Sequence, residues 1–318
     1  MSAIYNEAHL NSGIILLSED QFFYGDSLKN SLSSFVERQY LIDSFLYEHS
    51  SILLYAADGI GKSVLTLQLV IEAASGNPVF GVLKTSRQLR TLWVMAERHP
   101  IEIFERIKEM EKVVPLSPLE FGITTELQGF NLLNESYFTK AISIIEARAK
   151  ILSHIDLVVV DPIYALVAGG LSRDENDSCV TRFSTTLQNK FGCSCIFIHH
   201  SNRGVRSQEN PAERVGQDMY GGRFLSAHFT GIYHITKTSD GTHFAREKSS
   251  HRNLIESFDL TYDHETYVST LTDDSMPKRD RILIELRRLK TSGKWIELDA
   301  LAGISHVSTQ YLYKLFSR

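Results

Sequence analysis

The chain has 318 residues, of which 43% are hydrophobic and 22% charged, and its formal net charge is −5. These values are typical of soluble globular proteins, so they exclude a low-complexity chain and allow one large domain with a small appendage. No apolar run approaches the roughly 18 residues of a membrane span, and the N-terminal MSAIYNEAHLNSG lacks the basic and apolar regions of a signal peptide. We therefore expect a cytoplasmic protein with no membrane partner.

Residues 1–40 have no clear hydrophobic period, and we expect an N-terminal extension that leads into a helix around Phe35 to Tyr47. From Ser50 onward, apolar runs of strand length alternate with segments of helical spacing, which predicts an α/β fold with a mainly parallel sheet. Short closing strands in GIYHITKT, HFAREK and ESFDLTYD are expected to be antiparallel additions. This core would span residues 41–270, with a separate module at 277–318. Helices of the core are expected at 63–74, 100–112 and 139–152.

The stretch AADGIGKS, residues 56–63, nearly matches the phosphate-binding loop GxxxxGK[ST], with Ala56 in place of the first glycine. A strand-length apolar run precedes it and a helical pattern follows, so the loop lies where free helix amides suit a polyphosphate. Lys62 is expected to reach the outer phosphates of ATP, and the Ser63 hydroxyl to ligate Mg²⁺. An ordinary glycine-rich turn is the alternative. The predicted nucleotide-binding residues of the loop are Asp58, Gly59, Ile60, Gly61, Lys62, Ser63 and Val64.

Two acidic residues follow apolar strands further along the chain. Glu97 comes at the end of TLWVMAE, and Asp161 ends the strand in IDLVVVDPI. Ligands bind at the carboxyl edge of open α/β sheets. Asp161 is therefore predicted to hold the magnesium shell, and Glu97 to orient or deprotonate a water molecule. The structural alternatives are a cap or turn former for Asp161 and an exposed loop acid for Glu97.

The next strand, in CSCIFIHHSNR, ends in His199 and His200. No second set of ligands with recognisable spacing accompanies them, so a hydrogen bond to the γ-phosphate is favoured over a metal site. Cys193, Cys195 and the remaining Cys179 suit neither a disulfide framework nor a zinc site. We interpret them as reduced thiols in or near the core.

The C-terminal segment has its own charge pattern. Residues 276–318 carry nine Lys or Arg against four Asp or Glu, a local charge of +5, so residues 1–275 carry −10. Helical spacing in PKRDRILIELRRLKTSG predicts one helix; a second is expected through Glu297 to Leu301, a tight turn at AGIS (302–305), and a third helix from Val307. This pattern indicates a helix-turn-helix or winged-helix unit that presents Gln310 and Lys314 to duplex DNA. A solvated basic face or a protein-docking module, for example for a replication protein, is the alternative.

In this order, the motifs resemble those of the RecA-like hexameric ATPases over roughly Ser33 to Asp263. The chain is most similar to the plasmid RepA-type replicative helicases, with DnaB and KaiC as more distant relatives. The resemblance rests on ADGIGKS, LWVMAE followed by Arg106, LVVVDPI and IHHSNR. It implies a RecA-like core that binds ATP and Mg²⁺. It also implies roles for four residues: Glu97 as catalytic base, Asp161 as the acid near magnesium, His200 as γ-phosphate sensor and Arg106 packed on the adenine.

The same resemblance implies a homo-oligomeric, hexameric ring in which each ATP lies between subunits. The neighbouring subunit would supply a basic finger, which Lys248 and Arg252 of REKSSHRN match only loosely. The loop at 201–223 would face the central channel, with Arg203 and Arg206 on the phosphates of single-stranded DNA. This loop has four arginines against three acids, so a disordered surface loop is the alternative.

These features predict an ATP-dependent DNA helicase or translocase of a plasmid- or phage-type replication system. Two alternatives stay open. One is a recombination-associated or KaiC-like ATPase that loads or remodels other proteins. The other is a DNA-binding regulator that uses its C-terminal module on DNA and ATP as an assembly switch.

Overall fold

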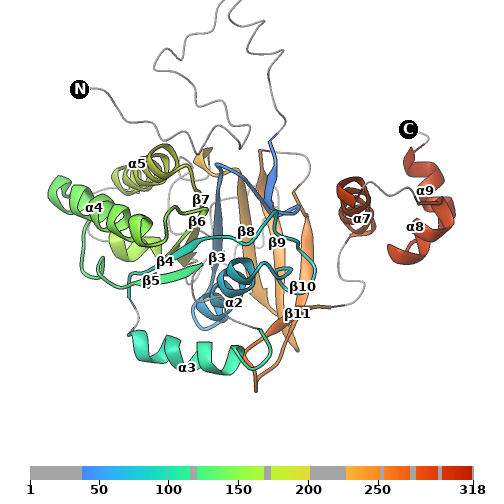
Figure 1. Ribbon diagram of the computed structural model, residues 1–318, viewed down its shortest axis with the longest axis horizontal. Helices are drawn as coiled ribbons and strands as arrows, with labels where there is room; N and C mark the ends of the chain where they lie inside the picture. The colour runs from blue at the N-terminus through green and yellow to red at the C-terminus, as the bar shows by residue number, and fades with distance from the viewer. Residues whose placement is uncertain are drawn as a thin grey trace, which may run out of the picture. The chain divides into compact units, whose positions relative to one another are not determined.

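The computed structural model describes residues 38–97, 99–114, 120–167, 173–200, 227–250, 254–272, 277–292 and 296–316. Contacts divide the chain after Gln39, and the described helices and strands belong to the unit Tyr40–Arg318. That unit is built around a nine-stranded sheet (Figure 1). Among the described helices, none has the length and apolar character needed to cross a membrane.

The sheet has the strand order β11-β10-β9-β8-β3-β7-β6-β4-β5. Neighbouring strands are parallel from β8 to β5, whereas β8 to β11 pair antiparallel. The predicted α/β fold with a mainly parallel sheet is therefore confirmed, and β9 to β11 are the antiparallel additions that were expected. The strand in GIYHITKT, β8, differs from the prediction, because it pairs parallel with β3 and antiparallel only with β9. The strands are β3 (Ser51–Ala56), β4 (Thr91–Met95), β5 (Phe121–Thr124), β6 (Leu157–Asp161), β7 (Ser194–His200), β8 (Gly231–Lys237), β9 (Gly241–Ser249), β10 (Ser257–Tyr262) and β11 (Ser269–Leu271).

Helices cover both faces of the parallel strands (Figure 1). The side chains of α2 (Lys62–Ser75) and α3 (Pro100–Met110) join one core cluster, and those of α4 (Glu135–Ile151) and α5 (Arg173–Phe191) join another. Successive residues of β3 alternate between the two, since Leu54 belongs to the first cluster and Leu53 to the second. Because both faces are buried, the central strands are apolar throughout rather than alternating.

The N-terminal part of this unit differs from the prediction. In place of a helix reaching Tyr47, residues 40–47 form a short antiparallel pair, β1 (Tyr40–Ile42) and β2 (Leu46–Tyr47). Ser44 has a positive φ of 58°, and the Phe45 amide bonds back to the Ile42 carbonyl at 3.1 Å. The chain therefore reverses between two buried apolar pairs, Leu41 with Ile42 and Phe45 with Leu46. Their spacing in the sequence is that expected for one face of a helix, which explains the wrong prediction.

The C-terminal residues form three helices, α7 (Lys278–Ser292), α8 (Leu298–Ile304) and α9 (Thr309–Phe316). They share a small core of Ile282, Leu289, Leu301, Ala302 and Leu312. The turn expected at AGIS is wrong, because Ala302 to Ile304 continue α8 and the chain turns at His306, whose φ is 50°. Ser308 caps α9, since its hydroxyl accepts from the Tyr311 amide at 3.2 Å.

Two contacts tie α7 to the sheet-bearing part of the unit. The Asp280 carboxylate accepts a hydrogen bond from the Glu256 amide at 2.8 Å, and Ile284 belongs to the core cluster under α2. Whether the three helices act as a separate DNA-binding module stays a prediction.

Candidate nucleotide-binding site

Strand register brings the predicted site residues to one edge of the sheet. Ala56 at the end of β3 pairs with His200 at the end of β7, and Met95 of β4 pairs with Asp161 of β6. The Ala96 amide donates to the Asp161 carbonyl at 2.8 Å, which holds the chain just before Glu97 against β6. Because these strands are parallel, their carboxyl ends converge where ligands bind in open α/β sheets.

The loop between β3 and α2 has the backbone geometry of a phosphate-binding turn. Gly59 and Gly61 have φ values of 79° and 94°, which disfavour any side chain. The amides of Val64 and Leu65 bond back to the Gly61 carbonyl at 2.9 and 3.0 Å, so α2 starts immediately after the loop. Ala56 lies before the turn as the fully buried last residue of an extended strand. Its methyl group is therefore accommodated where the sequence motif has glycine.

Lys62 lies over the start of the loop. Its ammonium donates to the Ala56 carbonyl at 2.7 Å and to the Ala57 carbonyl at 2.9 Å, and its side chain is buried. This positive charge is at the amino end of α2, where it adds to the positive end of the helix dipole. The combination of one buried ammonium and a helix amino end suits a bound polyphosphate.

The two strand-end histidines have different environments. His199 is buried, and its Nδ1 donates to the His200 carbonyl at 2.8 Å. Burial lowers the pKa of His199 to about 4, so this imidazole is neutral at physiological pH. In the described part of the chain, no group of three or more His, Cys, Asp or Glu is placed to hold a metal ion.

His200 connects β7 to the phosphate loop. Its Nδ1 bonds to the Asp58 carboxylate, and the Lys62 ammonium lies 3.5 Å from the same nitrogen. Burial and the positive charge of Lys62 lower the pKa of His200, while Asp58 opposes that shift. His200 therefore lies beside Lys62 and the phosphate loop, and its role as γ-phosphate sensor stays a prediction.

The residues at this edge also fit a magnesium ion. The Ser63 hydroxyl, at the start of α2, and the Asp161 carboxylate, at the end of β6, are oxygen donors on buried side chains. Magnesium is usually held by one or two protein oxygens together with phosphate oxygens and water. Ser63 and Asp161 would hold it in this way, and the bound ion would supply positive charge that stabilises phosphoryl transfer.

Glu97 has a partner that the sequence did not suggest. Its carboxylate is exposed and lies near Tyr164, in the 3-10 helix η2 (Ile163–Leu166) that follows β6, where it contributes to the raised pKa of that tyrosine. The Tyr164 ring packs edge-on against His200, with ring centroids 4.6 Å apart. Local spacing does not connect a tyrosine three residues after a strand-ending aspartate with an acid on another strand, so only the fold reveals this contact.

The structure places the remaining predicted ATP contacts less directly. Arg106, predicted to pack on adenine, is half-buried on α3 and close enough to Tyr262 of β10 to oppose the rise that burial causes in the pKa of that tyrosine. Lys248, a predicted trans finger, lies within β9 and donates to the Phe229 carbonyl at 3.3 Å. Burial lowers its pKa. Its predicted companion Arg252 lies outside the described residues.

The predicted DNA contacts fall into two groups. Arg203 and Arg206 lie outside the described residues. Gln310 and Lys314 are both exposed on α9, beside Tyr313, whose side chain is 61% exposed. This helix therefore presents the side chains that were predicted to face DNA, and their role stays a prediction.

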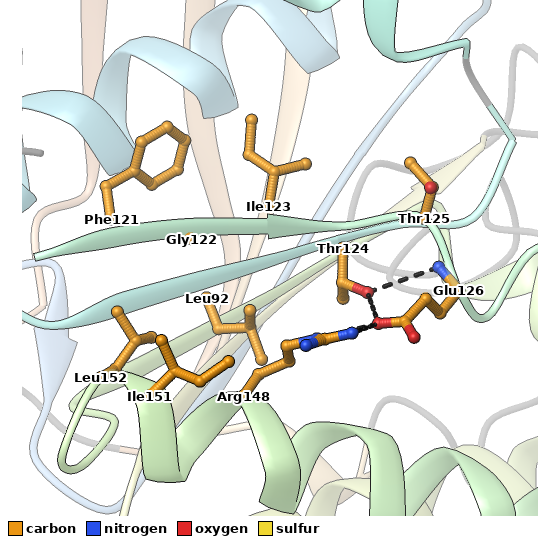
Figure 2. A pocket seen from close by; sticks show the side chains of 10 residues that line it. All are labelled: Leu92, Phe121, Gly122, Ile123, Thr124, Thr125, Glu126, Arg148, Ile151 and Leu152. Atoms are coloured by element: carbon orange, nitrogen blue, oxygen red, sulfur yellow. Dashed lines mark hydrogen bonds and ion pairs between the residues drawn. The ribbon is translucent and has the colours of Figure 1, made fainter.

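A separate cavity of about 500 Å³ lies at the β5 edge of the sheet (Figure 2). In it, Arg148 of α4 bonds to Glu126, whose carboxylate also accepts from the Thr124 hydroxyl at 3.1 Å. No residue of the phosphate loop lines it, so it is distinct from the nucleotide site. The lining residues are Leu92, Phe121, Gly122, Ile123, Thr124, Thr125, Glu126, Arg148, Ile151 and Leu152.

Comparisons with known proteins agree with this geometry. The family model described as AAA domain matches residues 23–205, more than half of the chain. Among solved structures, the chain is similar to a KaiC-like protein from the hyperthermophilic archaeon Pyrococcus horikoshii OT3, with a TM-score of 0.50 and 12% identity. That likeness covers 75% of this chain and 100% of the archaeal chain, and it shows a shared fold. A search of curated proteins found no significant match. The chain belongs to the AAA domain family and is a P-loop ATPase with a RecA-like core.

Proposed function

We propose that the protein is an ATP-driven DNA motor, a helicase or translocase of a plasmid- or phage-type replication system. The observation that carries this proposal is the convergence of Lys62, Asp161 and Glu97 at one sheet edge. A protein that only binds nucleotide needs the first two. Glu97 adds an exposed carboxylate on the neighbouring strand, where it can accept a proton from water that attacks the γ-phosphate.

The chain's own residues would act in sequence on ATP. Lys62 and the amides of the loop would hold the phosphates, while Ser63 and Asp161 would hold the magnesium ion. A γ-phosphate beside His200 would favour the protonated imidazole, which donates hydrogen bonds from both ring nitrogens. Water then attacks phosphorus in line with the leaving oxygen, and its proton passes to Glu97.

The ring and the DNA track are further parts of the proposal. We propose a hexamer in which a basic residue of the neighbouring subunit, Lys248 or Arg252, reaches the bound ATP. Single-stranded DNA would contact Arg203 and Arg206 in the channel. Support comes from the RecA-like core, the exposed position of Glu97 and the resemblance to RepA-type helicases.

The first experiment is steady-state ATP hydrolysis with and without single-stranded DNA, with Lys62→Ala as the inactive control. A motor should hydrolyse ATP severalfold faster when DNA is present, and should unwind a forked duplex only with hydrolysable ATP. If DNA does not change the hydrolysis rate and no duplex is unwound, the protein is not a DNA motor. The ATPase activity of the core would still hold in that case.

The exposed face of α9 supports a second candidate, a DNA-binding regulator that assembles on ATP. Gln310, Tyr313 and Lys314 are exposed on that helix, and the segment 276–318 is basic. For this function, ATP binding should change the oligomeric mass measured by light scattering, and Glu97→Gln should leave duplex binding unchanged.

A further inference from the structure

Tyr164 touches two of the residues to which hydrolysis is assigned. Its hydroxyl lies near the Glu97 carboxylate, and its ring packs edge-on at 4.6 Å from the ring of His200, with an interplanar angle of 82°. His200 in turn bonds to Asp58 of the phosphate loop. One side chain therefore joins the strand end that carries the base to the strand end beside the phosphates.

The element that carries Tyr164 is fixed to the core. Ile163 and Leu166, on either side of Tyr164 in η2, are fully buried in the cluster under α4 and α5. The Leu166 carbonyl accepts from the Leu132 amide at 2.7 Å, and the Tyr164 carbonyl accepts from the Val167 amide at 3.1 Å. Glu97, by contrast, is exposed and lies beyond the end of β4. The contact thus joins an anchored tyrosine to an acid at the start of a loop.

We propose that Tyr164 is a positioning residue for ATP hydrolysis, which holds the Glu97 carboxylate and the His200 ring in fixed relation to the γ-phosphate. One carboxylate oxygen of Glu97 accepts from the Tyr164 hydroxyl, and the other takes a proton from the attacking water. The bond from water oxygen to phosphorus forms while the bond from phosphorus to the β–γ bridging oxygen breaks, and the proton remains on Glu97. A near-attack geometry is maintained because the carboxylate cannot rotate away.

The hydroxyl donates without giving up its proton. Burial, followed by the hydrogen bond to Glu97 and the nearby charges of Asp58 and Asp161, raises the pKa of Tyr164. At neutral pH the phenol is therefore protonated and serves as a donor only. This role rests on the proposed hydrolysis at Glu97, and it is independent of the ring and of DNA.

The test compares Tyr164→Phe, which removes only the hydroxyl, with the matched control Tyr137→Phe on the exposed surface of α4. For Tyr164→Phe, kcat of the full chain should fall roughly tenfold, as expected when a hydrogen bond to a charged group is lost. The KM for ATP should stay within about twofold, because the phosphate loop is intact. Tyr137→Phe should leave both kcat and the KM for ATP unchanged.

A double-mutant cycle separates positioning from structural support. Glu97→Asp keeps a carboxylate but shortens it, so the hydrogen bond to Tyr164 is lost already. Tyr164→Phe should then cost little in the Glu97→Asp background. An equal loss of kcat in both backgrounds, or a lower unfolding temperature for Tyr164→Phe that accounts for the loss, would overturn the proposal.

A binding measurement gives a result that does not depend on turnover. Affinity for MgADP with aluminium fluoride, a mimic of the transition state, should fall about tenfold in Tyr164→Phe, while affinity for MgADP alone should not change. Unchanged affinity for the fluoride complex, or a higher kcat in Tyr164→Phe, would overturn the role of Tyr164. If the wild type hydrolyses ATP and Tyr164→Phe gives either of these results, only the role of Tyr164 is wrong and the proposed ATPase activity still holds.

Discussion

The parallel and antiparallel halves of the sheet contribute differently to this protein. The ends of the parallel strands β3, β7, β6 and β4 position the phosphate loop, His200, Asp161 and Glu97. The antiparallel strands β9 to β11 instead carry cross-strand pairs such as His243 with Asp259. Parallel strands all end at one edge, so side chains from distant parts of the chain collect there. Antiparallel neighbours start and end at alternate edges, and no such convergence follows.

The antiparallel half of the sheet nevertheless stabilises helix α2, which begins at the site. Gln68 on α2 donates from Nε2 to the Ser269 carbonyl of β11 at 2.6 Å and accepts from the Ser269 amide at 2.7 Å. Gln68 Nε2 also donates to buried Glu72, which accepts from the Phe80 amide as well. The helix that begins at Lys62 is therefore anchored to the far edge of the sheet. We expect substitutions in the parallel half to change activity and those at this anchor to change stability.

The largest expected effect is on hydrolysis in the parallel half. Glu97→Gln should lower kcat roughly a thousandfold, because the amide cannot accept the proton from water. Nucleotide affinity should stay nearly constant, since the loop is untouched. Steady-state ATPase assays measure kcat, and equilibrium binding measures nucleotide affinity. The exposed Glu105→Gln of α3 is the control. Retention of more than a tenth of the wild-type rate would remove Glu97 from the mechanism.

The second-largest effect is expected on stability, with little change in activity. Gln68→Ala leaves the Ser269 amide and carbonyl without their buried partner, which should lower the free energy of unfolding by about 2–4 kcal/mol. The kcat at 25 °C should change less than threefold. Denaturant unfolding of this variant and of the exposed control Gln128→Ala measures the difference. Equal stabilities of the two variants would show that α2 does not depend on β11.

A pH effect of similar size is expected from His199. Its folded-state pKa of about 4 lies below the ordinary value of 6.5, so between these values the unfolded chain binds more protons. Stability from this group is therefore complete above pH 6.5 and is lost as the pH falls to 4, by roughly 3 kcal/mol. His199→Asn keeps a donor near the Nδ1 position and cannot titrate. Its unfolding free energy should depend less on pH in this window than that of the wild type or of His243→Asn.

The smallest effect is expected at the residue that departs from the phosphate-loop motif. Ala56→Gly should lower stability by about 1–2 kcal/mol, because a buried methyl group is lost and the unfolded chain gains freedom. Hydrolysis should stay within twofold, since Ala56 precedes the left-handed part of the loop. Thermal unfolding and the ATPase rate test both statements. A severalfold faster rate in Ala56→Gly would mean that the methyl group restrains the loop.

Sequence patterns predicted best where structure depends on neighbours in the chain. The flanks of the phosphate loop were expected at Ser50–Ala56 and Ser63–Ala74, and the structure has them at Ser51–Ala56 and Lys62–Ser75. Prediction failed at β1 and β2, where buried Leu41, Ile42, Phe45 and Leu46 imitate a helical stripe. The polar helix α5 was missed because its buried stripe, which includes Val180, Phe183 and Leu187, is narrow.

The sequence by itself determined the loop at 56–63, the apolar strands and the acids that end them, because these depend on local spacing and on side-chain chemistry. Only the tertiary structure decided which of these residues meet. Strand order placed β7 between β3 and β6, and the register then set His200 beside Ala56 and Asp161 beside Met95. The contact between Tyr164 and Glu97 has the same origin. Contacts of this kind depend on strand pairing between distant segments, which no local spacing encodes.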